Sequence, residues 1–177
     1  MSFELKQFLV SGEIGVIRCG ISRENVVSTF GEAPAKQNLH DADGSIGEVR
    51  YGYGALSLFF QKGLLAGYGL CMDSDPDCEI PEFLHPVGYF PVGGKVPLVE
   101  FVDYLRKEGI SFRERREEED EWFKFFTEGD VGIGAGGPRN NVFCLLKVCL
   151  GTELWRTYKQ RVSLAIPGIT PPFLKTR

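Results

Sequence analysis

The stretch KFFTEGDVGIGAGGPRNN, residues 124–141, decides how the chain is expected to fold. Three of its glycines, Gly132, Gly134 and Gly137, fit the G-x-G-x-x-G spacing of a dinucleotide-binding turn. Such a turn requires a helix to begin at the glycines, so that backbone N–H groups meet the pyrophosphate. Here a turn-forming PRNN segment and the strand-like run VFCLLKVCL follow instead. We therefore interpret the glycines as part of a strand and expect no cofactor.

A second stretch, LFFQKGLLAGYG at residues 58–69, matches the first at a constant offset of 66 positions. The Phe-Phe pairs coincide, and Gly63 coincides with Gly129. Each copy predicts a strand, a tight turn in which glycine takes a positive φ, and a returning strand.

A helix is predicted upstream of each hairpin. In SRENVVSTFGEAP, Ser22 is a good N-cap and Gly31 ends the helix. In VPLVEFVDYLRKEG, Pro97 suits the first turn and Gly109 ends the helix. This order of elements predicts an α+β fold of two tandem helix-then-antiparallel-sheet units, with the helices on one face of the sheet.

The expected domain organisation follows from the same pattern. Residues 1–72 form the first unit and residues 96–177 the second, which ends in an extended tail. Residues 73–95, rich in proline and glycine, connect them within one compact domain. Residues 35–45 are expected to be a long loop.

Composition narrows the functional classes. A net charge of −4 over 177 residues does not favour nucleic-acid binding and suits a basic protein partner. The chain shows no secretory signal and no apolar run long enough to span a membrane. Its five cysteines include no C-x-x-C pair, so we expect reduced thiols and a cytoplasmic location.

No pattern of catalytic or metal-binding residues emerges. The acidic run Asp73, Asp75 and Asp77 begins like a calcium loop, but Cys78 stands where that loop needs glycine. The two histidines lie far apart in the sequence, and no nucleophile motif accompanies either of them. We expect no metal site and no enzymatic activity.

The stretch VIRCGISRENVVSTFGEAP, residues 16–34, resembles the N-terminal motif of the SmpA/BamE family of outer-membrane assembly lipoproteins. The β-lactamase-inhibitor-protein family carries a related arrangement in tandem. The matching positions are Gly20, Ile21, Ser22, Val26, Phe30, Gly31 and Pro34. The resemblance covers about 19 residues; a lipoprotein signal and the Gly-x-Ser start of the second helix are missing. The overall style is similar to that of small bacterial immunity proteins. This implies an exposed sheet or loops that hold another protein without catalysis.

The sharpest charge feature is RERREEEDEW, residues 113–122. One interpretation is a solvated strand end whose cations offset its anions. The functional interpretation is that the acidic block steers a basic partner while an aromatic anchors it. The residues expected to contact the partner are Trp122, Glu118, Glu119, Asp120, Glu121, Tyr51 and Tyr53.

The main hypothesis is therefore a non-catalytic, cytoplasmic protein-binding domain of the immunity type, which inhibits a toxin or enzyme by covering it. The alternative is a small-molecule-binding protein or enzyme that uses a cleft between the halves, lined by His85, Tyr89 and Cys78. A third hypothesis is a subunit that forms a homodimer through its exposed sheet face.

Overall fold

The computed structural model describes residues 2–40, 46–72, 79–88, 96–116, 123–136 and 140–149. Within this part of the chain there are three helices and ten strands. The helices are α1 (Leu5–Ser11), α2 (Arg23–Phe30) and α3 (Leu98–Lys107). The strands are β1 (Ser2–Glu4), β2 (Ala35–His40), β3 (Ile46–Tyr53), β4 (Leu56–Gln61), β5 (Leu64–Cys71), β6 (His85–Val87), β7 (Phe112–Glu114), β8 (Phe123–Thr127), β9 (Val131–Gly136) and β10 (Asn141–Val148).

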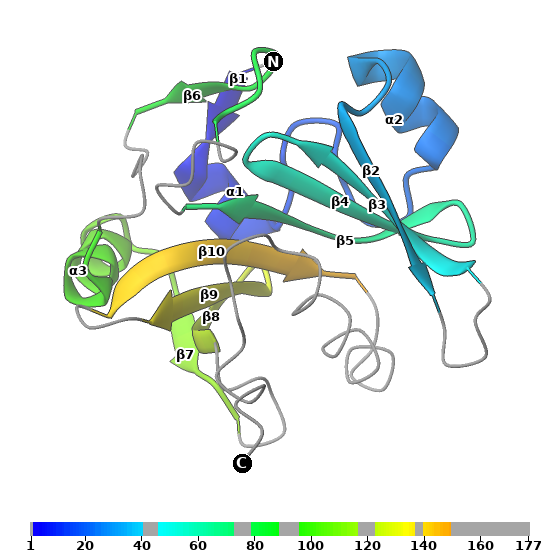
Figure 1. Ribbon diagram of the computed structural model, residues 1–177. Helices are drawn as coiled ribbons and strands as arrows, with labels where there is room; N and C mark the ends of the chain where they lie inside the picture. Colours follow the sequence, from blue (N-terminus) through cyan, green and yellow to red (C-terminus); the bar gives the residue numbers. More distant parts are fainter. Residues whose placement is uncertain are drawn as a thin grey trace.

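Eight of these strands form one continuous antiparallel sheet in the order β2-β3-β4-β5-β10-β9-β8-β7. The sheet twists along its length, so that strands at its two ends run in clearly different directions (Figure 1). The ladder between β5 and β10 joins the strands of the first half to those of the second. Separately, β1 and β6 form a two-stranded parallel sheet.

The predicted fold class, two tandem helix-then-sheet units of an α+β protein, is wrong. The protein has a mainly β fold: one sheet runs through both halves, and the helices have only 7, 8 and 10 residues. Two features of the chain produce the difference. Residues 35–40, expected to be loop, form β2. The last strands of the two halves pair with each other, so the halves do not build separate sheets.

The apolar sequences of β5 and β10 explain why these strands lie in the middle of the sheet. In β5, six consecutive residues, Leu65–Leu70, are buried, so both faces of the strand are covered. A continuous apolar run of this kind is typical of a strand buried on both sides. In β10, Leu145 is fully buried with the core and Leu146, on the opposite face, is also buried.

Local sequence determines where α2 and α3 begin and end. The Ser22 hydroxyl accepts a hydrogen bond from the backbone N–H of Asn25 at 3.2 Å, which confirms the predicted N-cap. Gly31 and Gly109, which follow the two helices, take φ values of 80° and 69°. In α3, Phe101 and neighbouring apolar residues are buried while Val99 is exposed.

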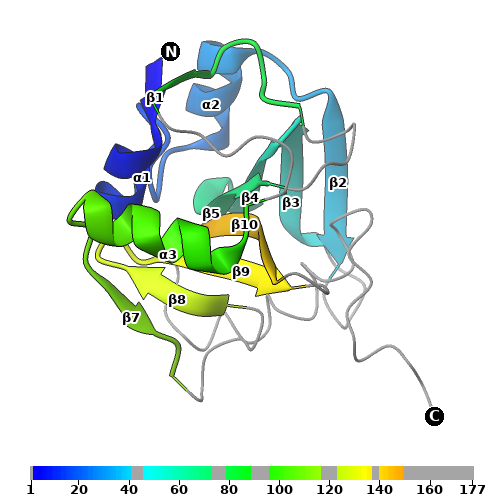
Figure 2. The same ribbon diagram turned by 90° about the vertical axis from the view of Figure 1, so that its left-hand side faces the viewer.

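The three helices contribute to one core on one face of the sheet. Leu5, Phe8 and Leu9 of α1 pack in the same cluster as Val26 of α2 and as Phe101 and Leu105 of α3. Figure 2 shows α1 and α3 on the same side of the sheet.

Helix α1 ends against the turn between β8 and β9. The carbonyl of Leu9 accepts hydrogen bonds from the backbone N–H of Gly129 at 3.1 Å and from the Thr127 hydroxyl at 2.5 Å. The Tyr68 hydroxyl donates a hydrogen bond to the carbonyl of Gly12, and burial raises the pKa of Tyr68, which keeps this donor protonated. Carbonyl groups at the end of α1 are thus satisfied by groups of the sheet.

Candidate functional site

The first half of the sheet ends in a long, exposed edge strand, β2. Among the described strands it pairs with β3 alone, in a register that places Lys36 opposite Tyr51 and Gln37 opposite Arg50. The four side chains of 35–38 are all exposed. The strand has no proline, and it has 6 residues where β7, at the other end of the sheet, has 3. Length and accessibility make β2 the more open of the two edges.

The alternation of hydrogen bonds across the sheet indicates which backbone groups of β2 point outward. The Cys71 N–H donates to the carbonyl of Ala55, so this pair is hydrogen-bonded between β5 and β4. In antiparallel sheets, hydrogen-bonded and non-hydrogen-bonded pairs alternate. We apply this alternation to the register of β4 with β3 and then to that of β3 with β2. The N–H and C=O groups of Gln37 then point toward β3. The N–H and C=O groups of Lys36 and Asn38 therefore point away from the sheet.

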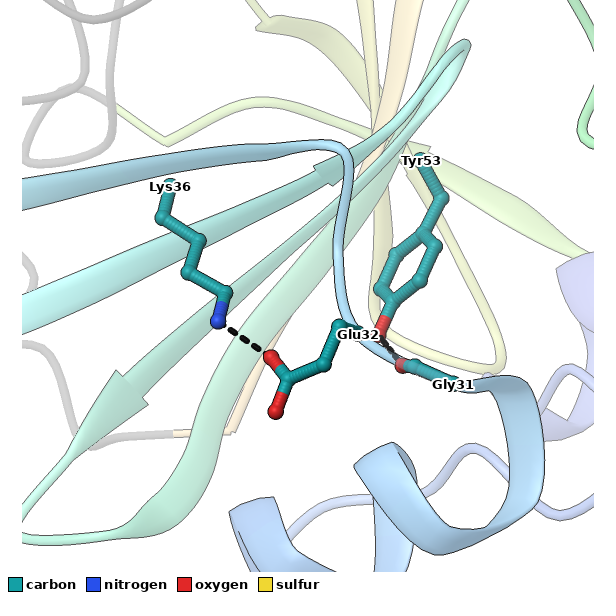
Figure 3. A network of polar contacts seen from close by, with 4 residues as sticks. All are labelled: Gly31, Glu32, Lys36 and Tyr53. Carbon is teal, nitrogen blue, oxygen red and sulfur yellow. Dashed lines mark hydrogen bonds and ion pairs between the residues drawn. The ribbon is translucent and has the colours of Figure 1, made fainter.

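A small polar network fixes the start of this edge strand to the end of α2 (Figure 3). Lys36 forms an ion pair with Glu32, and this hydrogen bond raises the pKa of Lys36. The Tyr53 hydroxyl donates to the carbonyl of Gly31 at 2.9 Å. Burial raises the pKa of Tyr53, so the phenol stays a donor at neutral pH. The network holds β2 in place beside the helix.

The two tyrosines predicted to contact a partner lie under this edge and are buried. Tyr51 is 7% exposed and its ring packs edge-on against Phe60, with centroids 5.3 Å apart. Tyr53 is 3% exposed and packs against Phe83 at 5.4 Å. The Lys36 ammonium lies 5.3 Å from the centre of the Tyr51 ring. Both rings support the edge from within the core.

The other predicted contact residues, Glu118–Trp122, lie outside the described residues. The described part of the charged segment begins on β7, where the Arg113 guanidinium lies 4.7 Å from the centre of the Phe126 ring. Arg115 and Arg116 follow β7 and are exposed. The structure thus places the basic end of this segment beside the second edge of the sheet.

Gly132 of β9 has a packing role. Gly132 lies beneath the Phe123 ring of β8, because a Cβ atom at this position would be 2.7 Å from a ring carbon. Gly69 of β5 is similar, since its Cβ would lie 2.9 Å from a methyl carbon of Leu146. The strand β10, and not a helix, follows these glycines. This arrangement contradicts a phosphate-binding turn and explains why both strands carry glycine on the face away from the helices.

The prediction that all cysteines are reduced is wrong for two of them. Cys19 and Cys149 form a disulfide across 130 sequence positions, with Cα atoms 5.3 Å apart. Both cysteines lie beside the start of β5. The Cys149 N–H donates to the carbonyl of Ala66, and the N–H of Gly20, which follows Cys19, donates to the carbonyl of Leu65. The segment after Cys19 therefore lies along β5 just beyond the point where β10 ends. Because this disulfide depends on a contact between distant parts of the chain, the spacing of the cysteines in the sequence does not predict it.

Of the residues proposed for a cleft between the halves, the structure describes His85 alone. His85 lies exposed on β6, opposite Ser2 of β1. Tyr89 and Cys78 lie outside the described residues. The junction between the halves is filled by the β5–β10 ladder, with Leu145 and Leu70 buried on its core face. Within the described ranges, no three His, Cys, Asp or Glu side chains gather as a metal site would require.

None of the helices described is both long and apolar enough to cross a membrane. Comparisons with protein-family models, with curated protein sequences and with solved structures find no match to this chain. Its function must therefore be inferred from its own residues, and among the described strands β2 offers an exposed edge of the sheet.

Proposed function

We propose that the protein is a non-catalytic protein-binding domain that holds its partner through the open edge of its sheet. The carrying observation is β2: a six-residue strand paired on one side, with exposed side chains at 35–38. An exposed edge of this kind binds an extended segment of another protein as an added strand, through main-chain hydrogen bonds.

The backbone groups of Lys36 and Asn38 would carry those hydrogen bonds. Their spacing is that of alternate strand residues, which is the repeat an added strand requires. The ion pair with Glu32 and the contact with the Tyr51 ring hold the Lys36 side chain against the protein. This arrangement offsets the charge that a lysine would otherwise present on the edge.

The mode of action that follows is inhibition by covering. A partner segment added to β2 would bring the rest of that partner against the neighbouring surface, where it would be blocked sterically. We propose a basic partner, because the chain carries a net charge of −4, and the acidic residues of Glu118–Trp122 as the element that steers it. This is the action of immunity-type inhibitors, the class that the sequence resembles in style.

The decisive experiment is affinity capture from a lysate of the native host with an edge variant and its matched control. Asn38→Pro removes an outward N–H without removing a hydrogen bond to β3, whereas Asn38→Ala keeps that N–H. We expect the wild type and Asn38→Ala to retain one stoichiometric protein, and Asn38→Pro to lose it. Circular dichroism and a urea unfolding curve confirm that all three proteins are folded.

The possible outcomes of this experiment distinguish an error in the binding site from an error in the proposed function. Retention by Asn38→Pro would show that a protein is bound elsewhere. Replacement of Trp122 and the acidic block by alanine then tests the second contact region, whose assignment is wrong if affinity falls by less than about threefold. A co-purifying small molecule without any protein would contradict the protein-binding function. A mass that rises with concentration would identify a second copy of this chain as the occupant of the edge.

The cytoplasmic location remains part of the proposal, and the Cys19–Cys149 bond provides a direct test of it. Disulfides persist mainly in oxidising compartments. Rapid alkylation of thiols in intact host cells, followed by mass spectrometry, reports whether Cys19 and Cys149 are bonded there. Alkylated Cys19 and Cys149 would support a cytoplasmic protein, and an intact bond would contradict it.

A further inference from the structure

Two more cysteines face each other across the junction of the two halves of the sheet. Cys71 of β5 and Cys144 of β10 are direct partners in the antiparallel ladder. Both are partly exposed, and neither takes part in the Cys19–Cys149 bond. Their side chains therefore lie on the same face of the sheet, within reach of solvent.

The hydrogen-bond pattern places these cysteines at a close pair. The Cys71 N–H donates to Ala55, on the β4 side of its strand, and therefore does not bond to β10. The Cys149 N–H donates to Ala66 of β5, and alternation along β10 again makes the Cys144 pair a non-hydrogen-bonded one. Cα atoms in such pairs are about 4.5 Å apart, and side chains are closer than in hydrogen-bonded pairs. This distance falls within the range of about 4.4–6.8 Å that a disulfide spans.

The neighbours of the pair in the same row across the sheet are small. Gly134 of β9 lies opposite Cys144, and Ala55 is hydrogen-bonded to Cys71 on the other side. Small residues directly beside both cysteines limit steric hindrance to rotation of the sulfur atoms toward each other, and the partial exposure of both cysteines allows a small oxidant to reach them.

The sheet itself separates this pair from the existing disulfide. Cys149 packs against the helix-covered core together with Leu145. Since successive strand residues point to opposite faces, Cys144 lies on the other face from Leu145. Thiol–disulfide exchange between the two pairs would require β10 to leave the sheet. The two pairs are therefore chemically independent.

We propose that Cys71 and Cys144 form a modification site, a dithiol that is oxidised to a cross-strand disulfide by low-molecular-weight disulfides such as glutathione disulfide. The thiolate of one cysteine attacks the oxidant, forming a mixed disulfide and releasing one thiol. The second thiolate attacks the protein sulfur of that mixed disulfide, which releases the second thiol. The protein loses two hydrogen atoms, and one oxidant molecule is reduced to two thiols.

The bond would lock the ladder that joins the halves of the sheet. At one end of the ladder, the Cys19–Cys149 bond ties the end of β10 to the segment that hydrogen-bonds with Leu65 of β5. At the other end, a Cys71–Cys144 bond would join β5 and β10 directly. The covalent clamp would restrict the unfolded chain further.

The test uses the full chain with Cys78→Ser, so that Cys71 and Cys144 are the remaining thiols while Cys19–Cys149 stays intact. The folded protein is incubated with glutathione disulfide, quenched with acid and analysed by mass spectrometry and peptide mapping. We expect the loss of two hydrogen atoms, a Cys71–Cys144 peptide pair, and a melting temperature raised by at least about 4 °C.

Single variants distinguish closure from simple reactivity. Cys71→Ser and Cys144→Ser, each in the Cys78→Ser background, should stop at one glutathione adduct because the resolving thiol is missing. The proposal is overturned if the parent protein accumulates glutathione on both cysteines, or if both thiols remain unreacted in the folded protein.

Discussion

The sequences of the two hairpins, β4–β5 and β8–β9, share a Phe-Phe pair and a turn glycine at an offset of 66 positions, yet the two glycines are needed for different reasons. In the first turn two residues, Lys62 and Gly63, connect the strands with φ values of 50° and 79°. Two consecutive positive φ values are typical of the tight turns that suit the twist of a hairpin. A Cβ atom on Gly63 would meet nothing within 4 Å.

The second turn has three residues, and its glycine is required for another reason. Asp130, not Gly129, takes the left-handed conformation, with φ 53°. A Cβ atom on Gly129 would lie 2.5 Å from the backbone nitrogen of Gly12. Gly129 is therefore glycine because the end of α1 packs directly on the turn. The comparison shows that an aligned glycine can reflect backbone conformation in one copy and close tertiary contact in the other.

Alanine and asparagine substitutions at Gly129 and Gly63 test most directly whether the two glycines are needed for different reasons. Gly129→Ala should lower the free energy of unfolding by about 3 kcal/mol, because backbone atoms of α1 must move to admit the methyl group. Gly63→Ala should cost about 1 kcal/mol, through its left-handed φ alone. Urea unfolding measures both changes.

Asparagine distinguishes a requirement for a positive φ from a requirement for space, because it tolerates a positive φ but is larger than alanine. Gly63→Asn should recover most of the stability lost in Gly63→Ala, whereas Gly129→Asn should be no better than Gly129→Ala. Recovery at Gly129 would mean that conformation, not contact, determines the residue there.

The next effect concerns the side chain two residues before each glycine. Thr127→Val removes the hydroxyl that donates to Leu9, with an expected loss of about 1–2 kcal/mol in unfolding free energy. Thr127→Ser keeps the hydroxyl and should retain most of that contribution. The aligned residue of the first hairpin, Gln61, is partly exposed, so Gln61→Val should change stability by less than about 0.5 kcal/mol. Equal losses at the two positions would contradict the distinction between the turns.

A smaller effect than that of Thr127→Val is expected at neutral pH from Tyr68, which aligns with Gly134 of the second hairpin. Tyr68→Phe removes the hydrogen bond to Gly12 and should cost about 1 kcal/mol. Burial raises the pKa of the folded tyrosine above that of about 10 in the unfolded chain. Its contribution is therefore fully present below pH about 10 and is lost as the pH rises from there through the folded-state pKa. The unfolding free energy of Tyr68→Phe should fall less steeply above pH about 10 than that of the wild type; equal slopes would exclude Tyr68 as a source.

Much of the sheet could be predicted from sequence because its strands carry strong local signals. The apolar runs of β4, β5 and β10 and the glycine turns between strands were sufficient to locate both hairpins. The helix starts were predictable from Ser22 and Pro97, since capping depends on only a few neighbouring residues.

The edge strand and the disulfide could not be predicted in this way. The β2 sequence AKQNLH has no apolar alternation, because its described side chains face solvent, so only pairing with β3 makes it a strand. The Cys19–Cys149 bond depends on a contact across 130 positions. Tyr51 and Tyr53 were expected on a binding surface, yet they are buried beneath β2, and the strand's period alone did not reveal which face was covered.

The bond between Cys19 and Cys149 also makes most of the chain a closed covalent ring. A protease that cuts once inside this ring leaves two peptides tied together, which migrate as one species on a non-reducing gel. Only a second cut, or a reductant, releases a fragment. The protein can thus be nicked and still keep its two halves together.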